Sequence, residues 1–303
     1  MTKQKLIAIT GPSSSGKTKL AIEVAKALNG EIISVDSRQI YKELDIGSAK
    51  PTIEEREGIP HHLMDIIDVT QEYTVADFCD DAKQKIKEII DKGKTPILAG
   101  GTGLYFRVLL QDFDLPRVAP NQELRDELEK LSSEELYNQL LELDYDIAQK
   151  IHFNNKVKII RALEVCKTLG IPMSKAQKKK ESEYDVLWFG LNSNDREFLY
   201  NRINKRVDIM LEQGLLKEAT ALFDKYGENK ILLGTIGYQE IYPFFKGEIE
   251  FETAIEQLKQ NTRRYAKRQI SWFNANKDIY WFDIQKDDIE NMKFIVVSEY
   301  EKL

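Results

Sequence analysis

A glycine-rich segment near the N-terminus limits the possible folds more than any other feature of the sequence. It reads Gly11-Pro12-Ser13-Ser14-Ser15-Gly16-Lys17-Thr18 and matches the pattern G-x-x-x-x-G-K-[ST]. The apolar run Leu6–Thr10 precedes it, and Lys17–Leu28 follows with its apolar residues on one helical face. A strand, a glycine loop and a helix in this order predict a loop whose backbone N–H groups bind a di- or triphosphate. The alternative without a phosphate-binding function is a glycine-rich turn that contains a lysine by chance.

Alternating strands and helices continue along the chain. Further strands are expected over Glu31–Val35, Pro96–Ala99, Val186–Leu191 and Ile279–Phe282. Helical periodicity is found over Ala76–Asp91, Asp195–Gly214, Leu215–Tyr226 and Thr253–Asn274. This alternation predicts an α/β fold, a P-loop NTPase-like parallel sheet flanked by helices.

The middle of the chain has a different pattern. Residues 120–180 contain no convincing strand, and helical periodicity is found over Leu124–Leu131, Glu134–Leu143 and Val157–Thr168. We therefore expect an inserted all-helical domain at residues 116–183, within a core of residues 1–115 and 184–303.

Composition excludes several classes of protein. Of 303 residues, 42% are hydrophobic and 31% charged, and no apolar run approaches the roughly 20 residues that span a bilayer. Cys79 and Cys166 are too few and too far apart for a disulfide framework or a cysteine zinc site, and we expect both in the core. His61-His62 has no third ligand nearby and is expected to be structural. A cytoplasmic monomer that does not contact membranes is the expectation.

Charge is unevenly distributed on a chain of net charge −6. Residues 156–180 contain eight lysines and arginines against one acid, Glu164, and residues 259–268 contain five with no acid. Such segregation can create a local positive surface for nucleic acid on an acidic protein. Two solvated helix faces would explain it equally well.

Two further polar segments follow strands of the expected sheet. Asp36 follows Glu31–Val35, and Gly100-Gly101-Thr102-Gly103 follows Pro96–Ala99. Strand ends of one parallel sheet meet at one edge, so both segments should lie beside the glycine loop. Asp36 could bind Mg²⁺, act as a general base, or cap a helix. No acid ends Pro96–Ala99 as in a Walker B strand, which disfavours an ATP-driven motor.

Together these segments resemble the tRNA dimethylallyltransferase (isopentenyl-tRNA transferase) family. The resemblance covers nearly the whole chain and rests on GPSSSGKT, SVDSRQIYKELDIGSAKPT, GIPHHLMDI, YTVADF, PILAGGTGLYF, IRALEV, DREFLYNRINKRVDIM, IGYQE and TRRYAKRQISWF. DSRQIY with DIGSAKPT and GGTGLY is the most specific part. No Cys/His finger lies near the C-terminus, as in the bacterial form.

The resemblance implies transfer of a dimethylallyl group from dimethylallyl diphosphate to N6 of the adenosine 3′ of the anticodon in tRNA, giving N6-isopentenyladenosine. Residues Gly11 to Thr18 would bind the diphosphate, with the cofactor Mg²⁺ near Thr18. Asp36 would take the N6 proton, Thr102 would place the adenosine, and Arg206 would be a second cation on the diphosphate.

The family also implies contacts with the tRNA. These would come from Asp36, Ser37, Arg38, Gln39, Thr102, Val157, Lys158, Ile159, Ile160, Arg161, Gly234, Thr235, Ile236, Gly237, Tyr238 and Gln239. Tyr265 and Trp272 could stack on bases, although aromatics at helical spacing are more often core residues.

Two other functions fit parts of the sequence. A nucleotide or small-molecule kinase would use the same loop with bound ATP and Mg²⁺, but does not call for the basic helices. An RNA-binding GTPase-like module lacks the N-K-x-D motif that reads guanine.

Overall fold

The computed structural model describes residues 3–111, 113–114, 116–176, 178–179 and 182–302. The chain forms two compact units. The first, here called the core unit, comprises residues 1–106 and 183–303, and the second, the helical unit, residues 107–182. The expected boundary residue 115 and Lys180 of the first basic run lie outside the described residues.

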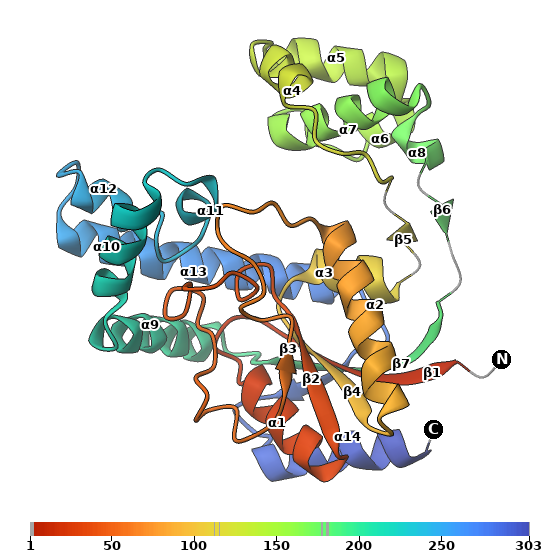
Figure 1. Ribbon diagram of the computed structural model, residues 1–303, viewed down its shortest axis with the longest axis vertical. Helices are drawn as coiled ribbons and strands as arrows, with labels where there is room; N and C mark the ends of the chain where they lie inside the picture. Colours follow the sequence, from red (N-terminus) through yellow and green to blue (C-terminus); the bar gives the residue numbers. More distant parts are fainter. Residues whose placement is uncertain (1–2, 112, 115, 177, 180–181, 303) are drawn as a thin grey trace. The chain divides into compact units, whose positions relative to one another are not determined.

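The core unit contains a six-stranded sheet whose paired strands are all parallel (Figure 1). Its strands, in spatial order, are β3 (His61–His62), β2 (Gly30–Val35), β4 (Thr95–Gly100), β1 (Gln4–Thr10), β7 (Tyr184–Asn192) and β8 (Tyr280–Asp283). Ile7 of β1 is in register with Ile97 of β4 and Leu187 of β7. The predicted α/β fold with a parallel sheet and flanking helices is confirmed.

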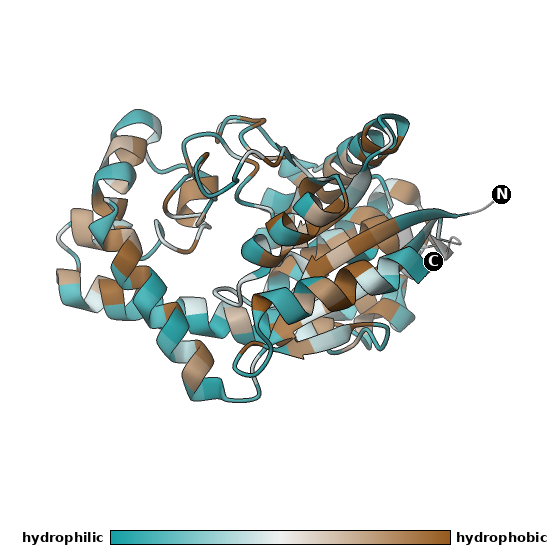
Figure 2. Cartoon of the chain, turned by 90° about the horizontal axis from the view of Figure 1, so that it is seen from below, coloured by the Kyte–Doolittle hydropathy of each residue, from teal (hydrophilic) through white to brown (hydrophobic). Residues whose placement is uncertain are grey.

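Helices pack on both faces of this sheet. On one face lie α1 (Lys17–Ala27) and α14 (Ile289–Lys302), and on the other α2 (Val75–Asp91), α3 (Gly103–Leu110) and the end of α13 (Phe251–Phe273). The core unit also contains α9 (Arg196–Glu212), α10 (Leu215–Tyr226), α11 (Lys230–Leu233) and α12 (Tyr242–Phe245), and α9, α10 and α11 pack with α13 around a separate buried cluster. Leu20 of α1 and Val296 of α14 share a buried cluster with Ile9. On the opposite face Trp188 packs against Phe106 of α3, which also packs against Phe273, the last residue of α13. Burial of these apolar side chains is the main stabilising contribution, and the sheet is correspondingly hydrophobic in Figure 2.

The strand order places a crevice at the carboxyl end of β1. From β1 the chain passes over β4 to β2, whereas from β4 it continues to β7 on the other side of β1. Ligands of open α/β sheets bind at such a reversal. The segments after β1, β2 and β4 therefore converge at this edge of the sheet.

The helical unit has a separate core. It contains α4 (Gln122–Glu129), α5 (Ser133–Leu143), α6 (Tyr145–Ala148), α7 (Lys156–Leu169) and α8 (Met173–Ala176), and the antiparallel pair β5 (Phe113–Asp114) and β6 (Lys178–Lys179). Leu128, Leu140 and Leu163 pack together inside it. The helices expected from periodicity at 124–131, 134–143 and 157–168 correspond to α4, α5 and α7.

One buried carboxylate joins α4 to α7. The Glu164 side chain is fully buried and accepts hydrogen bonds from the Asn121 N–H (2.7 Å) and twice from Arg125 (2.8 Å). Burial disfavours its charge, but these bonds and one from Arg161 lower the pKa of Glu164 to about 2. Glu164 is therefore ionised at neutral pH and fixes the N-terminus of α4.

None of the described helices is both long and apolar enough to cross a lipid bilayer. Cys79 and Cys166 are both buried, as expected.

Candidate active site

The loop of residues 11–18, called loop 11–18, adopts a backbone that requires glycine. Gly11 has φ 145° and Gly16 has φ 97°. A Cβ on Gly11 would lie 2.3 Å from the Leu191 carbonyl oxygen of β7. Gly16 precedes α1 as its N-cap and offers no side-chain acceptor. The N–H groups at the start of α1 are thus left for a ligand, and the helix dipole favours an anion there.

The polar side chains of loop 11–18 are poised for such a ligand. Lys17 Nζ donates to the Pro12 carbonyl at 2.6 Å. Desolvation lowers the pKa of Lys17 to about 8, although the negative charge of Asp36 acts in the opposite direction and raises it. Within the described chain, the buried Ser14 and Ser15 hydroxyls have no hydrogen-bond partner. An unpaired buried hydroxyl is costly, and Ser14, unlike Ser15, lines a cavity beside this loop, so the Ser14 hydroxyl fits a site whose partner is a ligand.

Side chains from two distant helices hold loop 11–18 in place. Gln269 of α13 is buried, accepts from the Ser13 N–H at 2.9 Å and donates to the Gly101 carbonyl at 3.0 Å. Arg202 of α9 donates to the Ser14 carbonyl at 2.9 Å. Gln269 thereby connects the loop after β1 to the turn after β4. Neither residue was predicted from the sequence.

Asp36 lies at the end of β2 and uses its two oxygens differently. Oδ1 accepts from the backbone N–H groups of Arg38 (2.8 Å) and Gln39 (3.3 Å). No donor in the described part of the chain contacts Oδ2. The capping interpretation and the chemical one are therefore compatible, because one oxygen caps a turn and the other stays available as a base.

Thr102 and Arg206 complete this edge of the sheet. Thr102 Oγ1 accepts from the Ser37 N–H at 3.2 Å, which links the segments after β2 and β4. Arg206 of α9 donates to the Ala49 carbonyl at 3.2 Å. The structure therefore brings Asp36, Thr102, Arg206 and loop 11–18 together.

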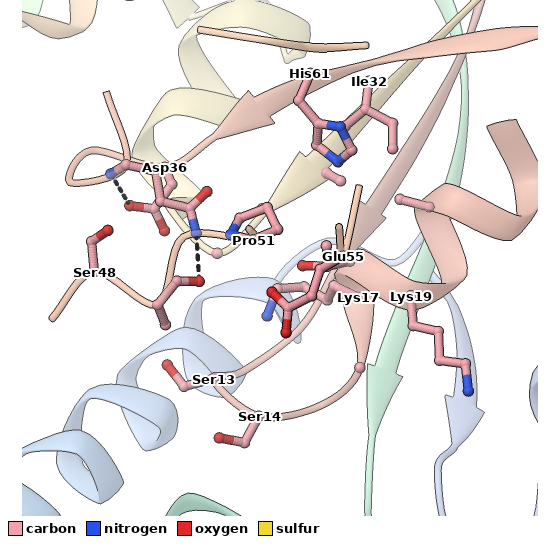
Figure 3. A pocket seen from close by; sticks show the side chains of 18 of the residues that line it. Ser13, Ser14, Lys17, Lys19, Ile32, Asp36, Ser48, Pro51, Glu55 and His61 are labelled. Carbon is pink, nitrogen blue, oxygen red and sulfur yellow. Dashed lines mark hydrogen bonds between the residues drawn. The ribbon is translucent and has the colours of Figure 1, made fainter. Parts of the chain in front are cut away.

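Two cavities of about 410 and 400 Å³ lie here. The first is lined by loop 11–18, including Lys17 and Thr18, and the second by Arg38, Gly234 and Arg268. Figure 3 shows the first, with Lys17, Ser13 and Ser14 opposite Asp36 and Ser48. Both cavities are lined by Ser13, Asp36, Ser48, Ala49, Arg206 and Tyr265. A group at this shared wall can touch two different ligands at once.

Protein side chains alone do not form a metal centre in the part of the chain described here. That part contains no group of three or more His, Cys, Asp or Glu residues placed to hold a metal ion. His61 and His62 form β3, and His62 Nε2 lies 2.7 Å from the buried carboxylate of Glu31. His62 thus has a structural partner, whereas His61 lines the first cavity, with its Nδ1 2.8 Å from the Ile59 carbonyl oxygen.

Comparison with known proteins decides the family. The profile described as IPP transferase matches residues 39–276. A tRNA dimethylallyltransferase of Bacillus anthracis is 46% identical over 94% of this chain and 92% of its own length. The chain belongs to the IPP transferase family.

Solved structures of relatives have the same fold. The crystal structure of a tRNA delta(2)-isopentenylpyrophosphate transferase from Staphylococcus epidermidis is 41% identical, with a TM-score of 0.74 over 99% of both chains. A eukaryotic dimethylallyltransferase, in structures described as acting on tRNA, is 33% identical with a TM-score of 0.85. The alignment covers 98% of this chain and 79% of that one.

In this IPP transferase family member, the residues expected to contact tRNA from the core unit have different surroundings. Arg38 donates to the Gly234 carbonyl at 2.9 Å, which brings segments 36–39 and 234–239 together. Gly234 is exposed, and Ile236 and Gln239 are half-buried. Thr235 and Tyr238 are 2% and 0% exposed. Thr235 nevertheless lines the second cavity, with Ile236 and Gln239, whereas Gly237 and Tyr238 are buried and line neither cavity. Contact of this segment with tRNA stays a prediction.

The residues of the helical unit that are predicted to contact tRNA also differ in exposure. Val157 is 76% exposed and Lys158 is exposed, whereas Ile159 and Ile160 are in the core. Arg161 donates to Glu164 at 2.5 Å and to the Val118 carbonyl at 3.0 Å. Arg161 thus has a structural task in addition to any contact with RNA.

The second basic run, on α13, is partly neutralised. Lys259 pairs with Asp208 at 2.8 Å, and Arg263 donates to Asn204 at 2.6 Å. The Arg268 guanidinium lies 5.5 Å from the ring centre of Tyr265, and both residues line the second cavity. Trp272 is 41% exposed and is therefore not a core residue. Tyr265 is half-buried and lines the second cavity.

Proposed function

We propose that this protein transfers a dimethylallyl group from dimethylallyl diphosphate to N6 of the adenosine 3′ of the anticodon in tRNA. The observation that carries the proposal is the position of Asp36 in the wall shared by the two cavities. The first cavity, with loop 11–18, suits the diphosphate donor. The second, with Arg38 and Arg268, suits a nucleotide of the acceptor. The printed names of the relatives support this assignment.

The donor side of the reaction follows from charge. The bond between C1 of the dimethylallyl group and the diphosphate oxygen breaks, and the negative charge develops on the diphosphate. N–H groups at the start of α1, the Lys17 ammonium and the Arg206 guanidinium would stabilise that charge. Mg²⁺ would be held by the Thr18 hydroxyl and by phosphate oxygens, the usual arrangement for this ion, and supplies further charge neutralisation when bound.

The acceptor side needs a base. The N6 lone pair of adenine is delocalised into the ring, and N6 becomes a better nucleophile as its proton leaves. Asp36 Oδ2 would accept this proton while the bond between N6 and C1 forms. Thr102, which fixes the Ser37 backbone, would help to place the adenosine. The base must leave its stack to enter the cavity.

The tRNA backbone would contact uncompensated cations. In the core unit Arg268 lines the second cavity, and in the helical unit Lys158 is exposed. No acid pairs with either residue among those described. In the core unit we expect segments 36–39 and 234–239 to contact RNA together with Arg268. We expect the helical unit to act as an insertion that contacts tRNA through Lys158.

A labelling experiment tests the proposal. The protein is incubated with dimethylallyl diphosphate labelled in the five-carbon group and with unmodified tRNA, and in parallel with labelled ATP and candidate acceptors. We expect label in tRNA at N6 of a single adenosine, and release of pyrophosphate. Transfer of phosphate from ATP without label in tRNA would instead identify a kinase and overturn the proposal.

A further inference from the structure

Glu218 of α10 binds a backbone turn with an unusually complete set of hydrogen bonds. Its Oε2 accepts from the N–H groups of Asp45 (3.2 Å) and Ile46 (2.8 Å). Its Oε1 accepts from the Gly47 N–H (2.9 Å) and the Tyr238 hydroxyl (2.7 Å). Three consecutive amides on one carboxylate form a nest with its anion already in place.

The turn that Glu218 holds leads directly to the proposed active site. Residues 45–50, called turn 45–50, close on themselves, with Lys50 N donating to the Asp45 carbonyl at 2.9 Å. Ala49 has φ 56°, and its carbonyl accepts from Gln39 Nε2 and from Arg206, both at 3.2 Å. Arg206 is the second cation proposed for the diphosphate. The position of its guanidinium thus depends on where turn 45–50 places one carbonyl oxygen.

Tyr238 ties the acceptor wall to the same carboxylate. Its side chain is fully buried, and a Cβ on Gly47 would lie 2.3 Å from its ring. Burial and the Glu218 charge raise the pKa of Tyr238, so its hydroxyl remains a donor. The Glu218 carboxylate therefore fixes both segment 234–239 and turn 45–50. Residues of the segment line the second cavity, and residues of the turn line both cavities.

We infer that Glu218 is a positioning residue for prenyl transfer, which acts through turn 45–50 to hold Arg206 against the diphosphate donor. Glu218 itself lines neither cavity. The inference rests on the proposed function for the identity of the donor. The physical link, from carboxylate to amides to carbonyl to guanidinium, is independent of what accepts the dimethylallyl group.

Glu218→Gln tests the link with little change in size. One side-chain oxygen becomes an NH₂ group that faces backbone N–H donors, so at least one bond of the set becomes a repulsion. Hydrogen bonds to charged groups are strong enough that we expect kcat/KM to fall about 10- to 100-fold. Binding of inorganic pyrophosphate, measured by calorimetry, should weaken in parallel. The matched control is Asp224→Asn on the exposed face of the same helix, which should change neither.

A double-mutant cycle with Arg206→Ala separates positioning from general stability. If Glu218 acts through Arg206, the double variant should be no worse than Arg206→Ala alone, a large departure from additivity. Tyr238→Phe, which removes one of the four bonds and keeps the three amides, should give a smaller loss that also vanishes in the Arg206→Ala background.

The inference is overturned if the losses add. It is also overturned if Glu218→Gln lowers only the melting temperature and leaves kcat/KM per folded molecule unchanged. The proposed function can fail separately. If wild-type protein does not label tRNA, but pyrophosphate binding shows the expected non-additive losses in Glu218→Gln and Arg206→Ala, the proposed function is refuted and the positioning role of Glu218 stands.

Discussion

Asp36→Asn isolates the chemical role of one oxygen. Asparagine keeps an oxygen at the Oδ1 position, where Asp36 accepts from the N–H groups of Arg38 and Gln39. Only Oδ2, which no described donor contacts, is replaced by a group that cannot take a proton. Loss of a general base lowers the rate by about 10²–10⁴, or about 3–5 kcal/mol of barrier. Stability should change by less than about 1 kcal/mol, because the turn keeps its acceptor.

The assay is single-turnover transfer from dimethylallyl diphosphate to tRNA, with tRNA binding and thermal unfolding measured on the same preparation. Asp36→Ala is the matched variant, since it removes the cap as well as the base and should also lose about 0.5–2 kcal/mol of stability. Turnover of Asp36→Asn within a few-fold of wild type would refute the base. Loss of pyrophosphate binding would instead make Asp36 part of the donor site.

Three further predictions concern charge. The pKa of Lys17 is about 8 in the free protein and its charge binds the diphosphate, so donor affinity should be constant between about pH 7 and 8, where the diphosphate is fully ionised, and fall up to about tenfold per pH unit above pH 8. Lys17→Met should bind weakly at every pH, and a wild-type profile that stays flat above pH 8 would contradict the assignment. Lys158→Glu should weaken tRNA binding and reduce the slope of log K against log salt by about one, while donor binding in the core unit is unchanged; an unchanged slope would remove Lys158 from the RNA surface. Glu164→Gln should destabilise the helical unit by about 3–5 kcal/mol in thermal unfolding or proteolysis, and a normal melting temperature would show that the hydrogen bonds to Glu164 are dispensable. In the wild type, the stabilisation from Glu164 should be full above pH 4.5 and be lost as the pH falls toward 2.

The elements that sequence analysis located are those with long, regular hydrophobic patterns. β1, β2, β4 and β7 were predicted to within a few residues because each is an apolar run between turn signals. β3 was missed, since two residues carry no periodicity and only pairing with β2 makes them a strand. α14 was also missed, since few of its residues, Met292 and Val296 among them, are buried against the sheet.

The site residues that directly follow a strand were predicted. The contacts between residues far apart in the sequence were missed. Loop 11–18, Asp36 and Thr102 each follow a strand, so parallel topology alone predicts that they converge. Gln269 lies 256 residues from its partner Ser13, and no spacing rule connects them. Tyr238 shows what a motif leaves open, because its segment is predicted to contact RNA while its own side chain packs in the core. A shared motif does not distinguish a residue that touches a ligand from one that supports the residue that does.

Acids held by partners within the fold explain why net charge is a poor guide to the partner of this chain. Glu164 and Glu218, and Glu31 beside Lys94, are each engaged by N–H groups or cations inside the fold, so they contribute to the charge of −6 without facing solvent freely. A polyanion that approaches the surface meets the cations that lack an acidic partner. Among described residues these include Lys158, Lys267 and Arg268. Because salt screens exposed charges far more than buried pairs, RNA affinity should follow these three cations steeply with ionic strength while the fold does not.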